Sequence, residues 1–179
     1  MQKTITIFGS AVPKAGDEQY EFAYQLGKKL AENNYAICNG GYAGIMEAVS
    51  KGAYDSGGMI YGITLDNWNS NPNDFITIEI RTKNLFERIS KLIELGDAYI
   101  VLQGGTGTLL ELAAVWELIN KNLIKDKPVI CHSDLWRQIV NLMNEQLKVE
   151  NKRYDLIDKA DSVDEIISIL KNKLNSSHI

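Results

Sequence analysis

One glycine-rich stretch, residues 103–111 (QGGTGTLLE), brings together the residue types best suited to chemistry. A run of strand formers precedes it and a helix-forming sequence follows it, so its glycines form a turn between a strand and a helix. Glycines let a ligand approach the backbone closely, and the first N–H groups of a helix attract anions. Glu111 lies about one turn into that helix. The stretch predicts a carboxylate beside a phosphate site, whose ligands are Gly104, Gly105, Thr106, Gly107 and Thr108.

The segments that must position this turn alternate between strand-like and helix-like patterns. Such alternation predicts an α/β fold of the Rossmann-like kind, in which a mostly parallel sheet carries helices on both faces. Ligands of such sheets bind at the carboxyl ends of the strands. Strands are predicted at residues 4–8, 35–38, 59–64, 75–80, 97–102 and 127–131, with helices at 17–32, 45–56, 84–95, from the glycine turn to 119, from 133 or 134 to 147, and from 161 or 162 to 174.

Two further glycine-rich turns follow the first and second predicted strands, at residues 9–11 and 39–44. All three turns therefore fall at the ligand-binding edge of the predicted sheet. None of them has the G-x-G-x-x-G spacing of a dinucleotide fingerprint, and the chain has no G-x-x-x-x-G-K-[ST] phosphate loop. The motifs disfavour an NAD-dependent enzyme and a P-loop ATPase.

Arg88 is predicted to meet Glu111 at this edge. The helix that carries Arg88 precedes the central strand, so its N-terminal end must lie beside the carboxyl end of that strand. A guanidinium at this place could hold a phosphate or a carboxylate. A simpler alternative is an ordinary connecting turn with Glu111 exposed. In that case Arg88 would be a solvated charge paired with Glu87 or Glu94.

The composition is that of an ordinary globular protein. The 179 residues are 45% hydrophobic and 23% charged, which predicts one domain over residues 1–179 with a frayed tail at 174–179. A net charge of −4 argues against a general nucleic-acid binder. No signal peptide opens the chain and no run of 18 apolar residues occurs in it, so we expect a cytoplasmic protein without a membrane partner.

The cysteines and histidines do not form a recognisable site. Cys38 and Cys131 both end apolar strand-like runs and are expected to be buried free thiols. His132 follows a strand and His178 lies in the polar tail, so neither is given a role in the site.

Taken together, these motifs resemble the LOG (Lonely Guy) family of nucleotide-processing proteins, which were long mislabelled as possible lysine decarboxylases. The family pattern PGGxGTxxE corresponds to residues 103–111, and the arginine 15 positions before it corresponds to Arg88. An early Gly-Ser element corresponds to residues 9–10, and the second glycine turn, often GGGxxGLM, to residues 39–46. The resemblance covers roughly residues 3–148.

The resemblance implies hydrolysis of the N-glycosidic bond of a nucleoside 5′-monophosphate, of purine or cytokinin type, to a free base and ribose 5-phosphate. It makes Arg88 and Glu111 the catalytic pair. Glu111 would stabilise the oxocarbenium charge that develops on the ribose or activate water, and Arg88 would hold polar groups of the substrate or assist departure of the base. With the 104–108 turn, the phosphate and ribose ligands would be Gly9, Ser10, Gly40 and Gly41.

The resemblance also implies that no cofactor or metal is required, and that the protein is a homodimer whose active sites lie near the subunit boundary. The apolar residues of the central helix could form that boundary or could equally be ordinary core. They are Leu109, Leu112, Ala113 and Trp116.

Several residues depart from the family pattern, and these departures bear mainly on which base is released. They also leave open a different function, that of a related protein that binds a phosphorylated ligand without cleaving it, such as a molybdenum-cofactor carrier. A lysine decarboxylase finds no support, because no lysine has a recognisable pyridoxal-phosphate context. The Asn-rich loop at residues 66–74, with Trp68, could shape the base pocket. The departures are Asn39, Glu47, Ile89, Gln103 and Leu110.

Overall fold

The computed structural model describes residues 2–66 and 71–175. These residues form a seven-stranded sheet with strand order β4-β3-β2-β1-β5-β6-β7, in which all neighbouring strands are parallel. The strands are β1 (Thr4–Phe8), β2 (Ala36–Asn39), β3 (Ile60–Leu65), β4 (Ile78–Thr82), β5 (Ala98–Val101), β6 (Val129–Cys131) and β7 (Ile157–Lys159). The helices are α1 (Glu18–Glu32), α2 (Ile45–Tyr54), α3 (Leu85–Leu95), α4 (Thr106–Asn120), α5 (Asp134–Val149) and α6 (Val163–Asn175).

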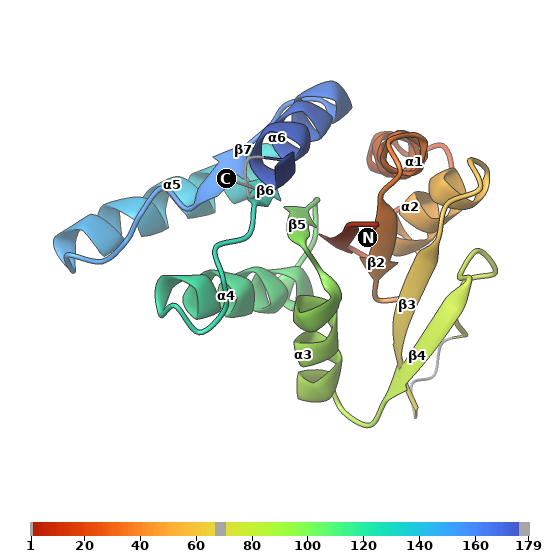
Figure 1. The fold of residues 1–179 in the computed structure, drawn as a ribbon, viewed down its shortest axis with the longest axis horizontal. Helices are drawn as coiled ribbons and strands as arrows, with labels where there is room; N and C mark the ends of the chain where they lie inside the picture. Colours follow the sequence, from red (N-terminus) through yellow and green to blue (C-terminus); the bar gives the residue numbers. More distant parts are fainter. Residues whose placement is uncertain (1, 67–70, 176–179) are drawn as a thin grey trace.

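Helices cover both faces of the sheet, as the alternating pattern predicts (Figure 1). Helices α1, α2 and α6 pack on one face and α3, α4 and α5 on the other, each set with its own buried hydrophobic cluster. The central strands are buried on both faces, which explains their nearly continuous apolar sequence. The predicted α/β Rossmann-like class is confirmed.

The order in which strands are added to the sheet reverses between β1 and β5, and this reversal creates the crevice. From β1 the chain builds outward through β2, β3 and β4, whereas β5, β6 and β7 extend the other side of the sheet. In open α/β sheets the ligand crevice lies at such a switch point. The glycine turns after β1, β2 and β5 all border this point.

The prediction of the sheet needs two corrections, both at its edges. The fourth strand lies at Ile78–Thr82 and not at residues 75–80, and β7 was not predicted. The strands were predicted from runs of apolar residues. An edge strand needs fewer apolar residues, because it is more exposed to solvent than a central strand. Polar residues such as Arg81 and Asp158 therefore belong to strands that hydrophobicity does not reveal.

Smaller predictions have clear outcomes. Cys38 and Cys131 are buried free thiols, as expected. No helix in residues 2–66 and 71–175 is long and apolar enough to cross a membrane. His178, Trp68 and most of the tail lie outside the described residues.

Candidate functional site

A cavity of about 610 Å³ opens at the carboxyl edge of the sheet, where the three glycine turns meet. Side chains from α2, α3 and α4 close its sides, and the ends of β1 and β3 contribute to its floor. Most of the predicted site residues border it, namely Gly9, Ser10, Gly40, Arg88, Gly105, Thr106, Gly107, Thr108 and Glu111.

Arg88 and Glu111 come together inside this cavity, as the chain direction predicts. Nη1 of Arg88 lies 3.6 Å from Oε1 of Glu111, and the two side chains are only 11% and 12% exposed. Neither alternative partner binds Arg88, since Glu94 pairs with Lys91 and Glu87 accepts a hydrogen bond from the N–H of Lys83. The arginine therefore belongs to the cavity and not to a solvated helix face.

Several groups outside the predicted set fix the Arg88 side chain. Its Nε donates to the carbonyl oxygen of Ile63 at 2.8 Å, and its guanidinium lies 5.6 Å from the centre of the Tyr42 ring, within cation–π range. Nη2 lies 4.0 Å from Sδ of Met46. A methyl group added at Gly40 would collide with this same Nη2. Gly40 is therefore required by the arginine that packs against it.

Burial perturbs the Glu111 carboxyl. Loss of solvation raises the pKa of Glu111 to about 7, and the positive charge of Arg88 opposes this rise. A carboxyl group that changes its charge near neutral pH is suited to stabilising a cation or accepting a proton.

The start of α4 borders the cavity, and the first backbone N–H groups of a helix have no partner within the helix itself. Its N-cap residue, Gly105, provides no side-chain cap. A methyl group added at Gly105 or Gly107 would meet no atom within 4 Å, so a ligand has room to approach the backbone there. Gly104 differs, because a methyl group at its position would strike the buried side chain of Thr108. The turn is therefore open at Gly105 and Gly107 and tightly packed at Gly104.

The other two turns have more structural roles than their sequences indicate. The backbone N–H of Ser10 donates to the carbonyl of Gln103 at 2.9 Å, and the carbonyl of Ser10 accepts from Ile45 at 2.8 Å. Ser10 thereby joins all three turns. Gly41, with φ +78°, is not among the residues that line the cavity, and the carbonyl oxygen of Gly41 accepts a hydrogen bond from Asn73.

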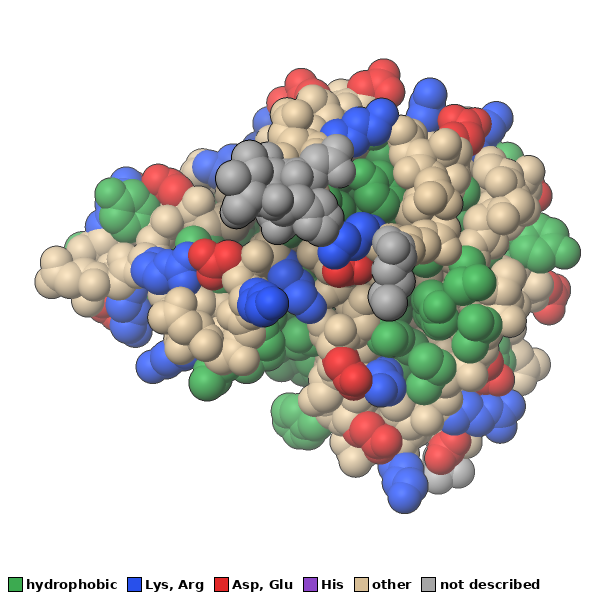
Figure 2. Space-filling model, in the orientation of Figure 1, with side chains coloured by type: hydrophobic (Ala, Val, Ile, Leu, Met, Phe, Trp, Pro, Cys, Tyr) green, Lys and Arg blue, Asp and Glu red, His purple; other side chains and the backbone are tan. Residues whose placement is uncertain are grey.

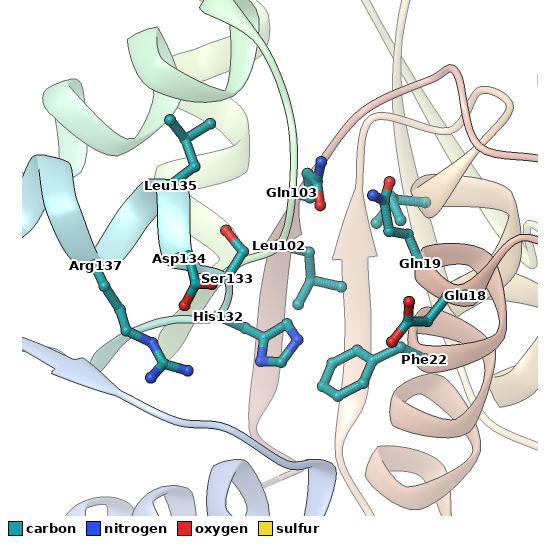
Figure 3. A pocket seen from close by; sticks show the side chains of 11 residues that line it. Glu18, Gln19, Phe22, Leu102, Gln103, His132, Ser133, Asp134, Leu135 and Arg137 are labelled. Atoms are coloured by element: carbon teal, nitrogen blue, oxygen red, sulfur yellow. The ribbon is translucent and has the colours of Figure 1, made fainter.

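A second cavity, of about 440 Å³, lies between the starts of α1 and α5. Gln103, which departs from the family pattern, borders this second cavity and is not among the residues that line the first one. Figure 3 shows His132 lying against Phe22 here, with ring centroids 4.0 Å apart. Nδ1 of His132 lies 3.0 Å from the carbonyl oxygen of Ala160. Packing accounts for this histidine.

Several residues that line the cavity were not predicted as site residues. Tyr42 lies in the second glycine turn and Met46 in the helix that follows it, both within the motif at residues 39–46, whereas Leu65, Asn71 and Leu85 belong to no motif. Asn71 comes from the Asn-rich loop, which supports a role for that loop in shaping the cavity. Within residues 2–66 and 71–175, no group of three or more His, Cys, Asp or Glu side chains is arranged to hold a metal ion.

An apolar groove lies on the surface outside the cavity. This groove of about 420 Å³ runs between α4 and α5, with Leu109 and Ala113 exposed and Leu112 and Trp116 buried. Half of this face is therefore ordinary core, and the other half is open to solvent. On the face shown in Figure 2, acidic and basic side chains are interspersed and form no basic patch.

Comparisons with known proteins place the chain in a family. A model of the SLOG cluster4 family matches residues 2–167. A cytokinin riboside 5′-monophosphate phosphoribohydrolase of Rhodococcoides fascians is 28% identical over 74% of this chain and 68% of its own length. A protein of the same name from Arabidopsis thaliana is 33% identical over 72% of this chain and 63% of its own length. The chain spans about half to two thirds of the curated relatives that it matches.

A solved structure matches over nearly the whole chain. The molybdenum cofactor binding protein from Rippkaea orientalis has a TM-score of 0.78 and 28% sequence identity, with 97% of this chain and 98% of that chain covered. The matched family model and these relatives show that the chain belongs to the SLOG cluster4 family and confirm its predicted kinship with the LOG proteins.

Proposed function

We propose that this protein hydrolyses the N-glycosidic bond of a nucleoside 5′-monophosphate, releasing a free base and ribose 5-phosphate. The observation that carries the proposal is the buried Arg88–Glu111 pair, which lies in one cavity with the open N-terminus of α4. A phosphate bound to the N–H groups of residues 105–108 would hold the sugar within reach of Glu111. The names of the relatives support the same reaction.

The chemistry requires few groups. As the bond between C1′ and the base nitrogen breaks, positive charge develops on the ribose, and the Glu111 carboxylate stabilises it. Water then adds its oxygen to C1′, and the proton that it loses balances the one taken up by the departing base. Arg88 holds polar groups of the substrate or assists departure of the base, while Thr108 supports the phosphate site. Which base leaves depends on the cavity wall formed by Met46, Leu65 and Leu85.

A second candidate function is that of a carrier that binds a phosphorylated ligand without cleaving it. The structural match to the molybdenum cofactor binding protein favours it, because that match covers both chains almost completely. The hydrolase relatives, by contrast, are matched over only part of their length. The two candidates share the phosphate site and differ in what Glu111 does.

We also propose that a second copy of the chain covers the apolar groove between α4 and α5. Leu109 and Ala113 are exposed there beside the buried indole of Trp116, whose Nε1 has no hydrogen-bond partner among the described residues. The groove lies on the helix that begins at the phosphate site, so a partner there would stand next to the cavity.

A panel of nucleoside monophosphates separates the two functions. We expect release of free base from a purine nucleoside 5′-monophosphate, while the matching nucleoside, which cannot use the N-terminus of α4, is left largely intact. Chromatography of the products measures this directly. Equal activity on nucleoside and nucleotide would contradict the phosphate site, and nucleotide binding without base release across the panel would establish the carrier function instead.

Replacing the carboxylate tests its catalytic role. We expect Glu111→Gln to lower kcat by about 10²–10³-fold, because a preorganised charge of this kind typically contributes that much to the rate. Nucleotide affinity should change only a few fold, since the phosphate contacts lie elsewhere. Glu94→Gln, which alters an exposed carboxylate on α3, serves as the control. A Glu111→Gln enzyme with more than about a third of the normal kcat would refute this role.

The raised pKa of Glu111 predicts a pH dependence of definite sign. Below about 7 the carboxyl is protonated, and above it the carboxylate is present. Because the proposed mechanism uses the carboxylate form, kcat/KM should rise between pH 6 and 8 with an inflection near 7. The second pKa of the substrate phosphate, about 6, falls inside this range, so kcat at saturating nucleotide is compared with kcat/KM to separate titration of Glu111 from titration of the free substrate. A fall across this range would instead identify Glu111 as a proton donor.

The proposed subunit contact predicts the effect of a charge in the groove. Ala113→Arg should convert a dimer to a monomer, because the guanidinium would have to be buried against an apolar surface. Sedimentation equilibrium measures the mass, and Leu123→Arg, at an exposed position beyond the end of α4, is the matched control. A wild-type protein that sediments as a monomer, or an Ala113→Arg variant that remains dimeric, would place the contact elsewhere.

A further inference from the structure

Asn39, at the first position of the second glycine turn, has a fully buried polar side chain. It is the last residue of β2, has no exposed surface, and is one of the departures from the family pattern. A buried amide must be satisfied by hydrogen bonds, because an unpaired polar group in the interior costs stability. The partners of Asn39 therefore show what its presence achieves.

Both the oxygen and the nitrogen of the Asn39 side-chain amide form hydrogen bonds. Oδ1 accepts from the backbone N–H of Gly41 at 2.8 Å, which closes the turn locally. Nδ2 donates to Oγ of Ser50 at 2.9 Å and to the carbonyl oxygen of Met46 at 3.3 Å, both on α2. One side chain thus fixes the turn and the first part of α2 relative to each other.

The two segments held by Asn39 are the two that confine Arg88. Gly40 lies inside the turn and packs against Nη2 of the arginine, and Met46 places its sulfur 4.0 Å from the same nitrogen. Alternation along the strand explains the arrangement, because Asn39 faces α2 while Gly40 faces the opposite side, toward α3. The guanidinium is thereby held between this wall and Glu111.

We propose that Asn39 is a positioning residue, which sets the place of the Arg88 guanidinium relative to Glu111 through Gly40 and Met46. It does not contact the cavity itself. Without its bonds to Gly41 and Met46, the wall behind Arg88 loosens and the guanidinium falls back from the carboxylate. The consequence for catalysis rests on the proposed hydrolase function, whereas the consequence for the Arg88–Glu111 pair does not.

The test compares Asn39→Ala with a matched control, Ser50→Ala. The control removes one partner of the same amide on the side away from the site and leaves the bonds to Gly41 and Met46 in place. A purely structural role for Asn39 would lower the Tm of both variants and leave the site unchanged. The informative measurement is the pKa of the Glu111 carboxyl, followed by carbon-13 NMR and assigned with Glu111→Gln.

We expect the pKa of Glu111 to rise by about 0.5 to 1 in Asn39→Ala, because an opposite charge moves away from it. It should stay unchanged in Ser50→Ala. In the same comparison kcat should fall about tenfold or more with a smaller change in KM, since misplaced catalytic groups slow turnover more than binding. A pKa of Glu111 that is unchanged or lowered in Asn39→Ala would overturn the proposal.

Two features keep the outcomes distinct. If Asn39→Ala does not fold, Asn39→Ser retains an oxygen that can accept from Gly41 but is too short to reach α2, and a smaller rise of the Glu111 pKa is expected. If the wild-type protein releases no base from any nucleotide, the hydrolase function fails, and the NMR titration still decides the role of Asn39.

Discussion

The site depends on a constraint of the backbone, namely the continuation of the β1–β5 ladder beyond the ends of both strands. Leu102 donates to the carbonyl of Phe8, and Ser10 donates to the carbonyl of Gln103. These bonds hold the first turn and the 103–108 turn in register, and the bond from Ile45 to Ser10 adds the start of α2. Three glycine turns far apart in sequence therefore act as one rigid frame around the cavity.

Within that frame, burial of the Arg88–Glu111 pair costs solvation free energy, which other interactions of the fold must offset. Burial disfavours the charged form of Glu111, and a single contact at 3.6 Å does not restore full solvation. The arginine is better satisfied, through the carbonyl of Ile63 and the ring of Tyr42. The result is a fixed cation beside a carboxyl group that is easily protonated. Such an arrangement is typical of sites where a rigid scaffold supports perturbed side chains.

The glycines of the site meet different physical demands. Gly40 and Gly104 leave no space for a side chain because Arg88 and Thr108 occupy it, whereas Gly105 and Gly107 leave space that the protein itself does not fill. Only the second kind leaves room for a ligand at the backbone. The sequence motif contains both kinds and cannot distinguish them, because the reason why a side chain is absent depends on neighbours that are distant in the sequence.

The sequence alone determined the α/β class, the central elements and the meeting of Arg88 with Glu111. These follow from periodicity and chain direction, which are local properties or simple consequences of parallel strands. Only the tertiary structure decided the limits of the edge strands, the place of Gln103 beside the second cavity, and the hydrogen-bond partners of Asn39. Each of these depends on contacts between residues distant in sequence, and a buried amide such as that of Asn39 has no pattern of its own until its partners on α2 are in place.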